Sequence, residues 1–201
     1  MIKENYIFDF GGVLLKWDPE QYFRNVVGGI EKQKWLFENI FTPEWRDRSD
    51  IYITVEKNVH ILSKRHPEHS ENIKLWNDDF FEIMNEIIAE NWDIVRHIKN
   101  NGGKVFGLAN FASDKYKQAL ERFPELGELD GILVSSEAYF CKPEPKIYIE
   151  ALKKFGISSQ STVFIDDSKD NIQIASELGI MSHHYTSSDE LRSFIQQLIK
   201  A

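Results

Sequence analysis

Four apolar runs, far apart in the chain, each lead into a polar side chain, and this pattern constrains the fold more than any other feature. The first run ends at Asp9, the second at Asn110 and the fourth at Asp166-Asp167, while Lys142 follows the third. Each run has the length and the β-branched or aromatic content of a buried strand. Open α/β sheets bind their ligands at the carboxyl ends of parallel strands. We therefore expect these side chains to meet at one site.

Strands alternate with helices from about residue 89 to the end of the chain. Glycine pairs, a proline at a helix start and the Ser187-x-x-Glu190 capping box mark the boundaries. The spacing predicts helices over 88–101 and 113–122, a helix from Pro145 to Gly156 and two more towards the end, with strands at 104–109, 131–135, 162–166 and 180–185. This order predicts an α/β fold, a Rossmann-like parallel sheet flanked by helices.

Residues 16–88 interrupt that alternation and show only helical signals. Helices are predicted over 20–27, 31–41, 55–64 and roughly 70–87, separated by Gly28-Gly29, Thr42-Pro43 and His66-Pro67. We expect residues 1–15 and 89–201 to form the Rossmann-like catalytic core. Residues 16–88 are then a helical cap, inserted after the first strand, which excludes water and selects the substrate.

Charge and cysteine content exclude several classes of protein. The 201 residues carry 24 Lys and Arg against 32 Asp and Glu, a formal net charge of −8. Nucleic acid and anionic membranes are therefore poor partners, since both attract a clustered basic surface. The single Cys141 cannot form an internal disulfide, and the N-terminus has no signal-peptide pattern. We expect a cytoplasmic protein that acts on a small molecule; its oligomeric state is not predicted.

The carboxylates at the strand ends indicate a nucleophile and a Mg²⁺ site. Asp9 precedes Phe10-Gly11-Gly12, where glycines let backbone N–H groups approach an anion. Asp9 alone could equally be a turn or N-cap residue. Adjacent acids such as Asp166 and Asp167 repel unless a cation holds them, and Mg²⁺ prefers carboxylates, water and phosphate oxygens. We expect Asp167 to bind the metal, with Asp166 as a nearby second acid.

Other polar residues are weighed against ordinary structural roles. The Lys142 ammonium could neutralise both Asp9 and a bound phosphate, and Asn110 could donate to a substrate oxygen. In the cap, Trp45 and Arg46 are candidate substrate contacts, although a solvated segment between helices is equally consistent with the pattern. The pair His183-His184 and Cys141 are expected to be structural, because adjacent strand residues point to opposite faces and a free cysteine commonly packs as a small apolar group.

The order of these motifs resembles the haloacid dehalogenase (HAD) superfamily of aspartate-nucleophile hydrolases over nearly the whole chain. Phe8-Asp9-Phe10-Gly11-Gly12-Val13 and Lys142-Pro143-Glu144-Pro145-Lys146-Ile147-Tyr148 are most similar to the branch of glucose-1-phosphate phosphatases and the phosphatase domain of soluble epoxide hydrolases. The resemblance implies that Asp9 attacks phosphorus and forms an aspartyl-phosphate. It also implies that Mg²⁺ binds Asp9, the carbonyl of Gly11 and Asp167. Lys142 and the Gly11-Gly12 turn would then hold the phosphoryl group.

Two positions depart from the family pattern. Gly11 stands where most phosphatases of this type carry a general acid/base Asp, a role that contributes about 10²–10⁴-fold. Ala109 stands where a Ser or Thr hydroxyl binds the phosphoryl group, a hydrogen bond worth roughly 1.5–3 kcal/mol. Some members of the similar branch also have glycine at the first position. A third position, Tyr139, replaces a glycine often found before the lysine.

Three functions fit these motifs. The first is a Mg²⁺-dependent phosphatase that hydrolyses small phosphorylated metabolites, faster for acyl and aryl phosphates than for sugar 6-phosphates because Gly11 cannot protonate the leaving group. The second is a catalytically degenerate member that binds a phosphorylated ligand or a protein. The third is a 2-haloacid dehalogenase, which needs neither an acid at position 11 nor the Asp166-Asp167 metal pair.

Overall fold

A five-stranded parallel sheet forms the centre of the computed structural model, which describes residues 4–200. The strand order is β3-β2-β1-β4-β5. The strands are β1 Asn5–Phe8, β2 Lys104–Ala109, β3 Gly131–Val134, β4 Thr162–Asp166 and β5 Met181–His184. All pairings are parallel, with Phe8 beside Gly107 of β2 and Ile165 of β4. The predicted α/β class with a Rossmann-like sheet is confirmed.

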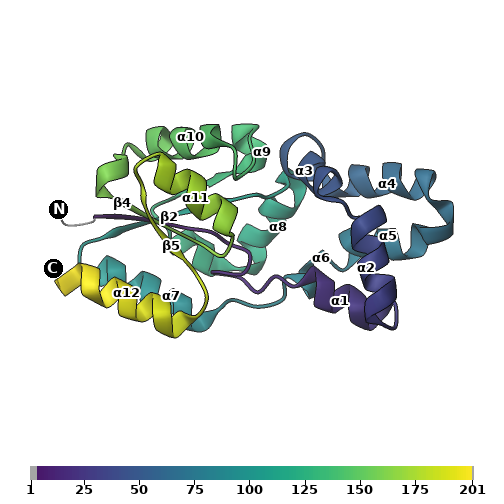
Figure 1. The fold of residues 1–201 in the computed structure, drawn as a ribbon, viewed down its shortest axis with the longest axis horizontal. Coiled ribbons are helices and arrows are strands. Elements are labelled where there is room, and N and C mark those ends of the chain that lie inside the picture. The colour runs from purple at the N-terminus through teal and green to yellow at the C-terminus, as the bar shows by residue number, and fades with distance from the viewer. Residues whose placement is uncertain (1–3, 201) are drawn as a thin grey trace.

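Helices cover both faces of this sheet (Figure 1). Alternate residues of β1 enter different cores: Tyr6 and Phe8 pack in one, Ile7 in the other. The first core receives α7 Ala89–Asn100, α8 Ser113–Arg122, η2 Pro124–Glu128 and α12 Ser188–Lys200. The second receives α9 Ser135–Ala138, α10 Pro145–Phe155 and α11 Lys169–Glu177, and the short η3 Ser159–Ser161 precedes β4. Burial on both faces explains why the strands read as continuous apolar runs.

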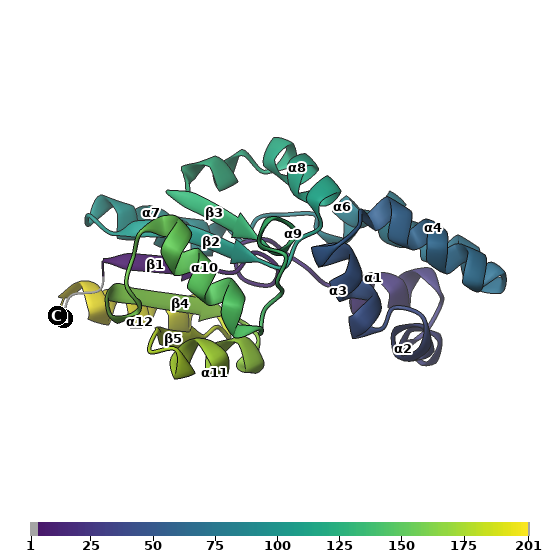
Figure 2. The same cartoon turned by 90° about the horizontal axis from the view of Figure 1, so that it is seen from above.

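The cap lies beyond the carboxyl edge of the sheet, toward which the strand arrowheads point (Figure 2). Its elements are α1 Pro19–Val26, α2 Ile30–Asn39, α3 Pro43–Ile51, α4 Val55–Arg65, η1 Pro67–His69, α5 Ser70–Asp78 and α6 Phe80–Ile83. An aromatic cluster holds them together: Phe23, Phe41 and Trp45 all contact the Trp76 ring, at centroid distances of 5.7, 4.8 and 5.2 Å. These rings belong to the same buried apolar cluster as Tyr6 and Phe8 of β1, so the cap packs as an extension of the first core.

Two details of the predicted cap were wrong. The pattern predicts a break between helices at Thr42-Pro43, but Thr42 caps a helix through its side chain and Pro43 is the first residue of α3. The helix predicted over 70–87 ends at Asp78, is followed by the single turn α6, and becomes extended before α7. There Leu15 and Ile87 form an antiparallel bridge, and the Lys16 N–H donates to the Glu86 carbonyl at 2.8 Å. The segments leaving and re-entering the core are thus paired.

No helix within residues 4–200 is long and apolar enough to cross a membrane. Residues 1–3 and 201, which belong to the predicted core, lie outside the described residues.

Candidate active site

Asp9 is fixed by the turn that follows β1. Its backbone N–H donates to the Ile165 carbonyl at 2.9 Å, and its Oδ1 accepts the Phe10 N–H at 2.6 Å. The Phe10 ring is fully buried and lies where a side chain at Gly107 would stand, 2.4 Å from an ideal Cβ. The Leu14 and Leu15 N–H groups return to the Phe10 carbonyl, both at 2.8 Å. This turn points the Asp9 carboxylate out of the carboxyl edge of the sheet.

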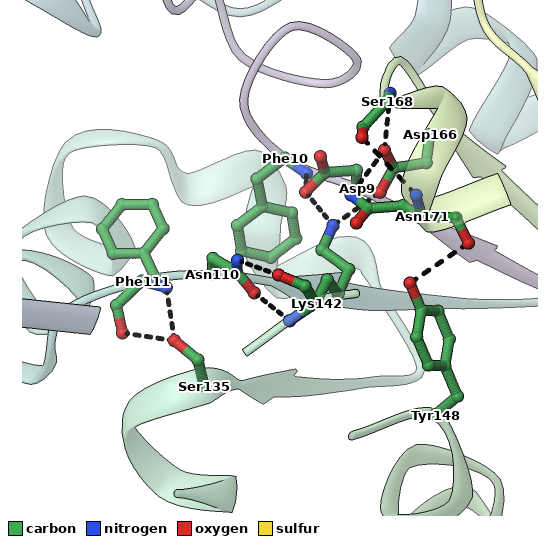
Figure 3. A network of polar contacts seen from close by, with 10 residues as sticks. All are labelled: Asp9, Phe10, Asn110, Phe111, Ser135, Lys142, Tyr148, Asp166, Ser168 and Asn171. Carbon is green, nitrogen blue, oxygen red and sulfur yellow. Dashed lines mark hydrogen bonds and ion pairs between the residues drawn. The ribbon is translucent and has the colours of Figure 1, made fainter. Parts of the chain in front are cut away.

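The Lys142 ammonium lies between two carboxylates. Its Nζ is 2.7 Å from Asp9 Oδ1 and 2.7 Å from Asp166 Oδ2, and the side chain is only 2% exposed (Figure 3). Burial alone would lower the pKa of Lys142, but the two carboxylates outweigh it and raise that pKa. The pKa of Asp9 is raised by burial, which exceeds the opposing effect of Lys142. When ionised, the clustered carboxylates of Asp9, Asp166 and Asp167 carry more negative charge than the one Lys142 ammonium balances.

Asp166 and Asp167 differ in their environments. Asp166 is fully buried, and its Oδ1 accepts the Ser168 N–H at 2.8 Å and the Asn171 Nδ2 at 2.9 Å. With Lys142 on Oδ2, both oxygens of Asp166 already have donors. Asp167 as a whole residue is exposed, but its carboxylate faces the site. Partial burial of that carboxylate and the neighbouring Asp166 raise its pKa. Of the two, Asp167 is the carboxylate with oxygens left for a ligand.

The carboxylates of Asp9, Asp166 and Asp167 fit a divalent cation. One oxygen from each lies within 4.8 Å of the other two. At Gly12, a Cβ would stand 2.4 Å from Asp167 Oδ2, and the backbone has φ +76°, so the turn admits this carboxylate because it has no side chain. A cluster of hard oxygen donors with surplus negative charge suits Mg²⁺.

Asn110 positions the lysine segment. Its Oδ1 accepts the Lys142 N–H at 2.8 Å and its Nδ2 donates to the Lys142 carbonyl at 2.9 Å (Figure 3). Nearby, Ser135 Oγ accepts the Phe111 N–H at 2.8 Å and donates to the Asp50 carbonyl of the cap at 2.6 Å. Ser135 carries no signal in the sequence, because a serine after a strand is ordinary. Asn171 is expected from the sequence to cap the helix after β4, but Ser168 is the cap and Asn171 donates to Asp166 instead.

A cavity of about 540 Å³ lies between these residues and the cap. Asp9, Gly11, Asn110, Lys142 and Asp167 line its core side. The cap contributes aromatic and charged side chains, among them Trp17, Trp76, Phe80, Arg46, Asp47 and Asp50. Trp45 does not line this cavity; its ring is turned into the cap cluster, between Phe41 and Trp76. Of the other two positions that depart from the family pattern, Ala109 is buried and Tyr139 is 67% exposed.

The histidines and the cysteine lie beside the site. The His183 ring stacks on Phe194 at a centroid distance of 4.3 Å, and His184 Nε2 lies 3.0 Å from the Asp167 carbonyl oxygen. Cys141 is buried, and burial raises the pKa of its thiol to about 12. A thiol with so high a pKa is a packing group at neutral pH.

The family model described as haloacid dehalogenase-like hydrolase matches residues 6–184. The chain belongs to this family. Among relatives, a sesquiterpene phosphatase, astK, of Aspergillus oryzae is 25% identical, with 96% of this chain and 95% of the relative covered. A phosphorylated carbohydrates phosphatase of Thermotoga maritima is also 25% identical, over 88% of this chain and 82% of that protein. The HAD-like chain is thus similar to phosphatases over most of its length.

Solved structures share the fold of this HAD-like chain. A HAD family enzyme from Bacteroides thetaiotaomicron, in a magnesium complex, has a TM-score of 0.71 at 24% identity and covers 91% of this chain and 93% of its own. A structure from Porphyromonas gingivalis, described as a predicted HAD-like family hydrolase, has a TM-score of 0.76 at 19% identity over 100% of both chains.

Proposed function

We propose that this HAD-like hydrolase is a Mg²⁺-dependent phosphatase that hydrolyses small phosphorylated metabolites through an aspartyl-phosphate on Asp9. The observation that carries the proposal is the buried Lys142 ammonium, 2.7 Å from both Asp9 and Asp166, at the base of a cavity that Asp167 also lines. Such an arrangement offers a nucleophilic carboxylate, a cation for the phosphoryl oxygens and acidic ligands for a metal.

Each residue then has a defined task. Asp9 Oδ1 is held by Lys142 and the Phe10 N–H, whereas Oδ2 accepts no hydrogen bond from any residue in the 4–200 range. The Asp9 carboxylate attacks phosphorus, the ester P–O bond breaks, and its electron pair leaves with the alcohol oxygen. Water then attacks the acyl-phosphate phosphorus, which releases phosphate and restores the carboxylate. Mg²⁺, held by Asp9, Asp167 and the Gly11 carbonyl, would offset charge on the transferring group.

The remaining site residues support this task. Lys142 and the Gly11-Gly12 turn would bind phosphoryl oxygens, and Asn110 fixes the lysine backbone. Arg46, which lines the cavity, is the cap residue retained as a substrate contact. Two similar proteins are named as phosphatases of a terpenoid and of phosphorylated carbohydrates, which supports phosphomonoesters as the substrate class. We infer a cytoplasmic location from the lone cysteine.

The test is phosphate release from a panel of acyl, aryl and sugar phosphates, with Mg²⁺ and with the metal chelated. We expect turnover that requires Mg²⁺ and that Asp9→Asn abolishes, because an amide cannot attack phosphorus. No release above the Asp9→Asn background on any substrate would contradict the proposal. Thermal stabilisation by phosphorylated ligands without release would instead favour the catalytically degenerate reading of Gly11 and Ala109.

A further inference from the structure

Position 11, where most HAD phosphatases carry an acid, is crowded by Trp17, which would have to shift to admit any side chain there. An ideal Cβ on Gly11 would lie 3.3 Å from Trp17 Cβ, 3.3 Å from its Cγ and 3.4 Å from its Cδ1. Carbon atoms pack best at about 3.5–4.0 Å, so even a methyl group is crowded here. A carboxylate would have to extend further along the indole. Trp17 can therefore occupy its place because residue 11 has no side chain.

Trp17 is held in this place by the cap. Its ring lies 5.3 Å from the Phe80 ring and 6.2 Å from the Trp76 ring. The indole remains partly exposed, and it lines the cavity that contains Asp9 and Lys142. A rigid aromatic group with two buried neighbours is a preformed surface, which costs little entropy when a ligand packs on it. Trp17 thus presents such a surface beside Gly11, two positions after Asp9.

Two kinds of side chain line the cavity. Five of them are aromatic or apolar: Trp17, Trp76, Phe80, Met84 and Phe111. Helix α3 supplies the charged groups Arg46, Asp47 and Asp50. A flat apolar leaving group is therefore the best match for the indole and its aromatic neighbours. A small or strongly hydroxylated leaving group would cover less of this surface with apolar area.

We propose that Trp17 is the specificity-determining residue that contacts the leaving group, and that it selects aryl phosphates over phosphates with a small or strongly hydroxylated leaving group. This inference rests on the proposed phosphatase activity and names its substrate class. Glycine at position 11 fits the same substrates, because a phenolate leaves with its electron pair far more readily than an alkoxide and does not need an acid to protonate it. Trp17 and Gly11 then serve the same class of substrate.

The test compares phenyl phosphate with acetyl phosphate, which carries no ring, in wild type, Trp17→Ala and Trp17→Phe. We expect the ratio of kcat/KM for phenyl over acetyl phosphate to fall about tenfold in Trp17→Ala, mainly through KM, since a tenfold change corresponds to about 1.4 kcal/mol of aromatic contact. Trp17→Phe keeps a ring and should retain most of the ratio. Trp35→Ala is the matched control, because that cap indole is 44% exposed and lies on His69, away from the cavity.

Binding supplies a readout that does not need turnover. With Mg²⁺ present, phenylphosphonate should raise the melting temperature of wild type more than methylphosphonate does, and Trp17→Ala should lose this preference. An unchanged kcat/KM ratio, or an unchanged phosphonate preference, in a folded Trp17→Ala would overturn the inference while leaving the phosphatase standing. Absence of phosphate release from both substrates would instead contradict the phosphatase, and the phosphonate preference would then decide the role of Trp17 alone.

Discussion

At the scale of single residues, the chemistry depends on one buried ammonium among three carboxylates. Lys142 is 2.7 Å from each of Asp9 and Asp166, and its side chain is almost fully buried. A buried charge cluster of this kind contributes little net stability when complete, but losing one partner leaves the others desolvated and unpaired. Lys142, which we propose binds the phosphoryl group, is for this reason also a residue on which the fold depends.

We expect Lys142→Met to abolish phosphate release and to lower the free energy of unfolding by about 3–5 kcal/mol without Mg²⁺. The cause is the unpaired Asp9 and Asp166 carboxylates. Urea denaturation measures the loss, and Lys146→Met is the matched control, since that lysine lies on the same segment with a side chain 64% exposed. If both substitutions lower the free energy of unfolding by the same small amount, the ion pairs of Lys142 do not stabilise the fold.

The missing acid at Gly11 predicts a dependence on the leaving group. Without a protonating group, the alcohol oxygen leaves with a full negative charge, so the rate should fall steeply as the pKa of the leaving alcohol rises. Acyl and aryl phosphates should be hydrolysed at least about 10²-fold faster than sugar 6-phosphates, by analogy with what a positioned acid contributes. Single-turnover rates along a series of substituted phenyl and alkyl phosphates measure this. A flat series would mean that another group protonates the leaving oxygen.

At the scale of elements, α3 illustrates where sequence reasoning failed. Residues 43–51 are rich in alternating charges, and only Trp45 and Ile51 are strongly apolar, so no helical periodicity stands out. The helix forms because Thr42 caps it, Pro43 starts it, and the buried Asn58 donates to the Trp45 carbonyl and to Ser49 Oγ, both at 2.7 Å. Thr42 and Pro43 are local helix-start signals, although the pattern predicts a break between helices there, whereas the Asn58 contacts come from the next helix and no local pattern contains them.

The end of α3 carries a carboxyl group with an altered pKa. Burial raises the pKa of Asp50 to about 7, Asp47 and Asp114 add to the rise, and Arg46 opposes it. In the unfolded chain the group titrates near its ordinary value, so the fold is favoured at low pH and loses that contribution as the pH rises toward 7. The neighbouring Cys141 thiol stays neutral over this range.

We therefore expect Asp50→Asn to stabilise the protein above pH 7 and to change little near pH 4. Because the side chain is not fully buried, we expect about 1 kcal/mol at pH 8, a rise of about 2–4 °C in melting temperature for a chain of this length. Asp93→Asn on the exposed face of α7 is the control. If Asp50→Asn shifts the melting temperature equally at both pH values, the carboxyl group does not titrate as described.

At the scale of the whole molecule, the sequence predicted the core more accurately than the cap. The strand ends that carry Asp9, Asn110 and Asp166-Asp167 converge, because parallel topology places the end of every strand at one edge. The pattern predicts Lys142 directly after the third strand, but β3 ends at Val134 and α9 intervenes, so Lys142 reaches the site from a loop that Asn110 holds. What each side chain does there depends on its neighbours in space. Asn110 turns back to the Lys142 backbone, and Trp45 turns into the cap cluster instead of the cavity. Trp17, which no motif marks, lines the cavity.

The cap and the core meet through apolar packing, a few polar contacts and the paired segments at 15–16 and 86–88. The Phe80 and Phe81 rings lie 6.0 Å from Phe111 and 6.3 Å from Phe123, respectively. Asp114 of α8 accepts the Val55 N–H at 3.1 Å, Lys115 donates to the Asn77 carbonyl at 2.9 Å, and Ser135 donates to the Asp50 carbonyl. These contacts hold the cap over the cavity that Asp9 lines. We propose that phosphoryl transfer to Asp9 takes place in this partly open cavity beneath the cap.

The most direct measurement is to trap the intermediate. The protein is mixed with Mg²⁺ and acetyl phosphate, quenched in acid within the first turnover, digested, and analysed by mass spectrometry. We expect one phosphoryl group on the peptide that contains Asp9, removed by hydroxylamine as an acyl-phosphate is and absent in Asp9→Asn. Phosphate release that proceeds with no phosphorylated Asp9 peptide, or with the phosphoryl group on another residue, would contradict the account.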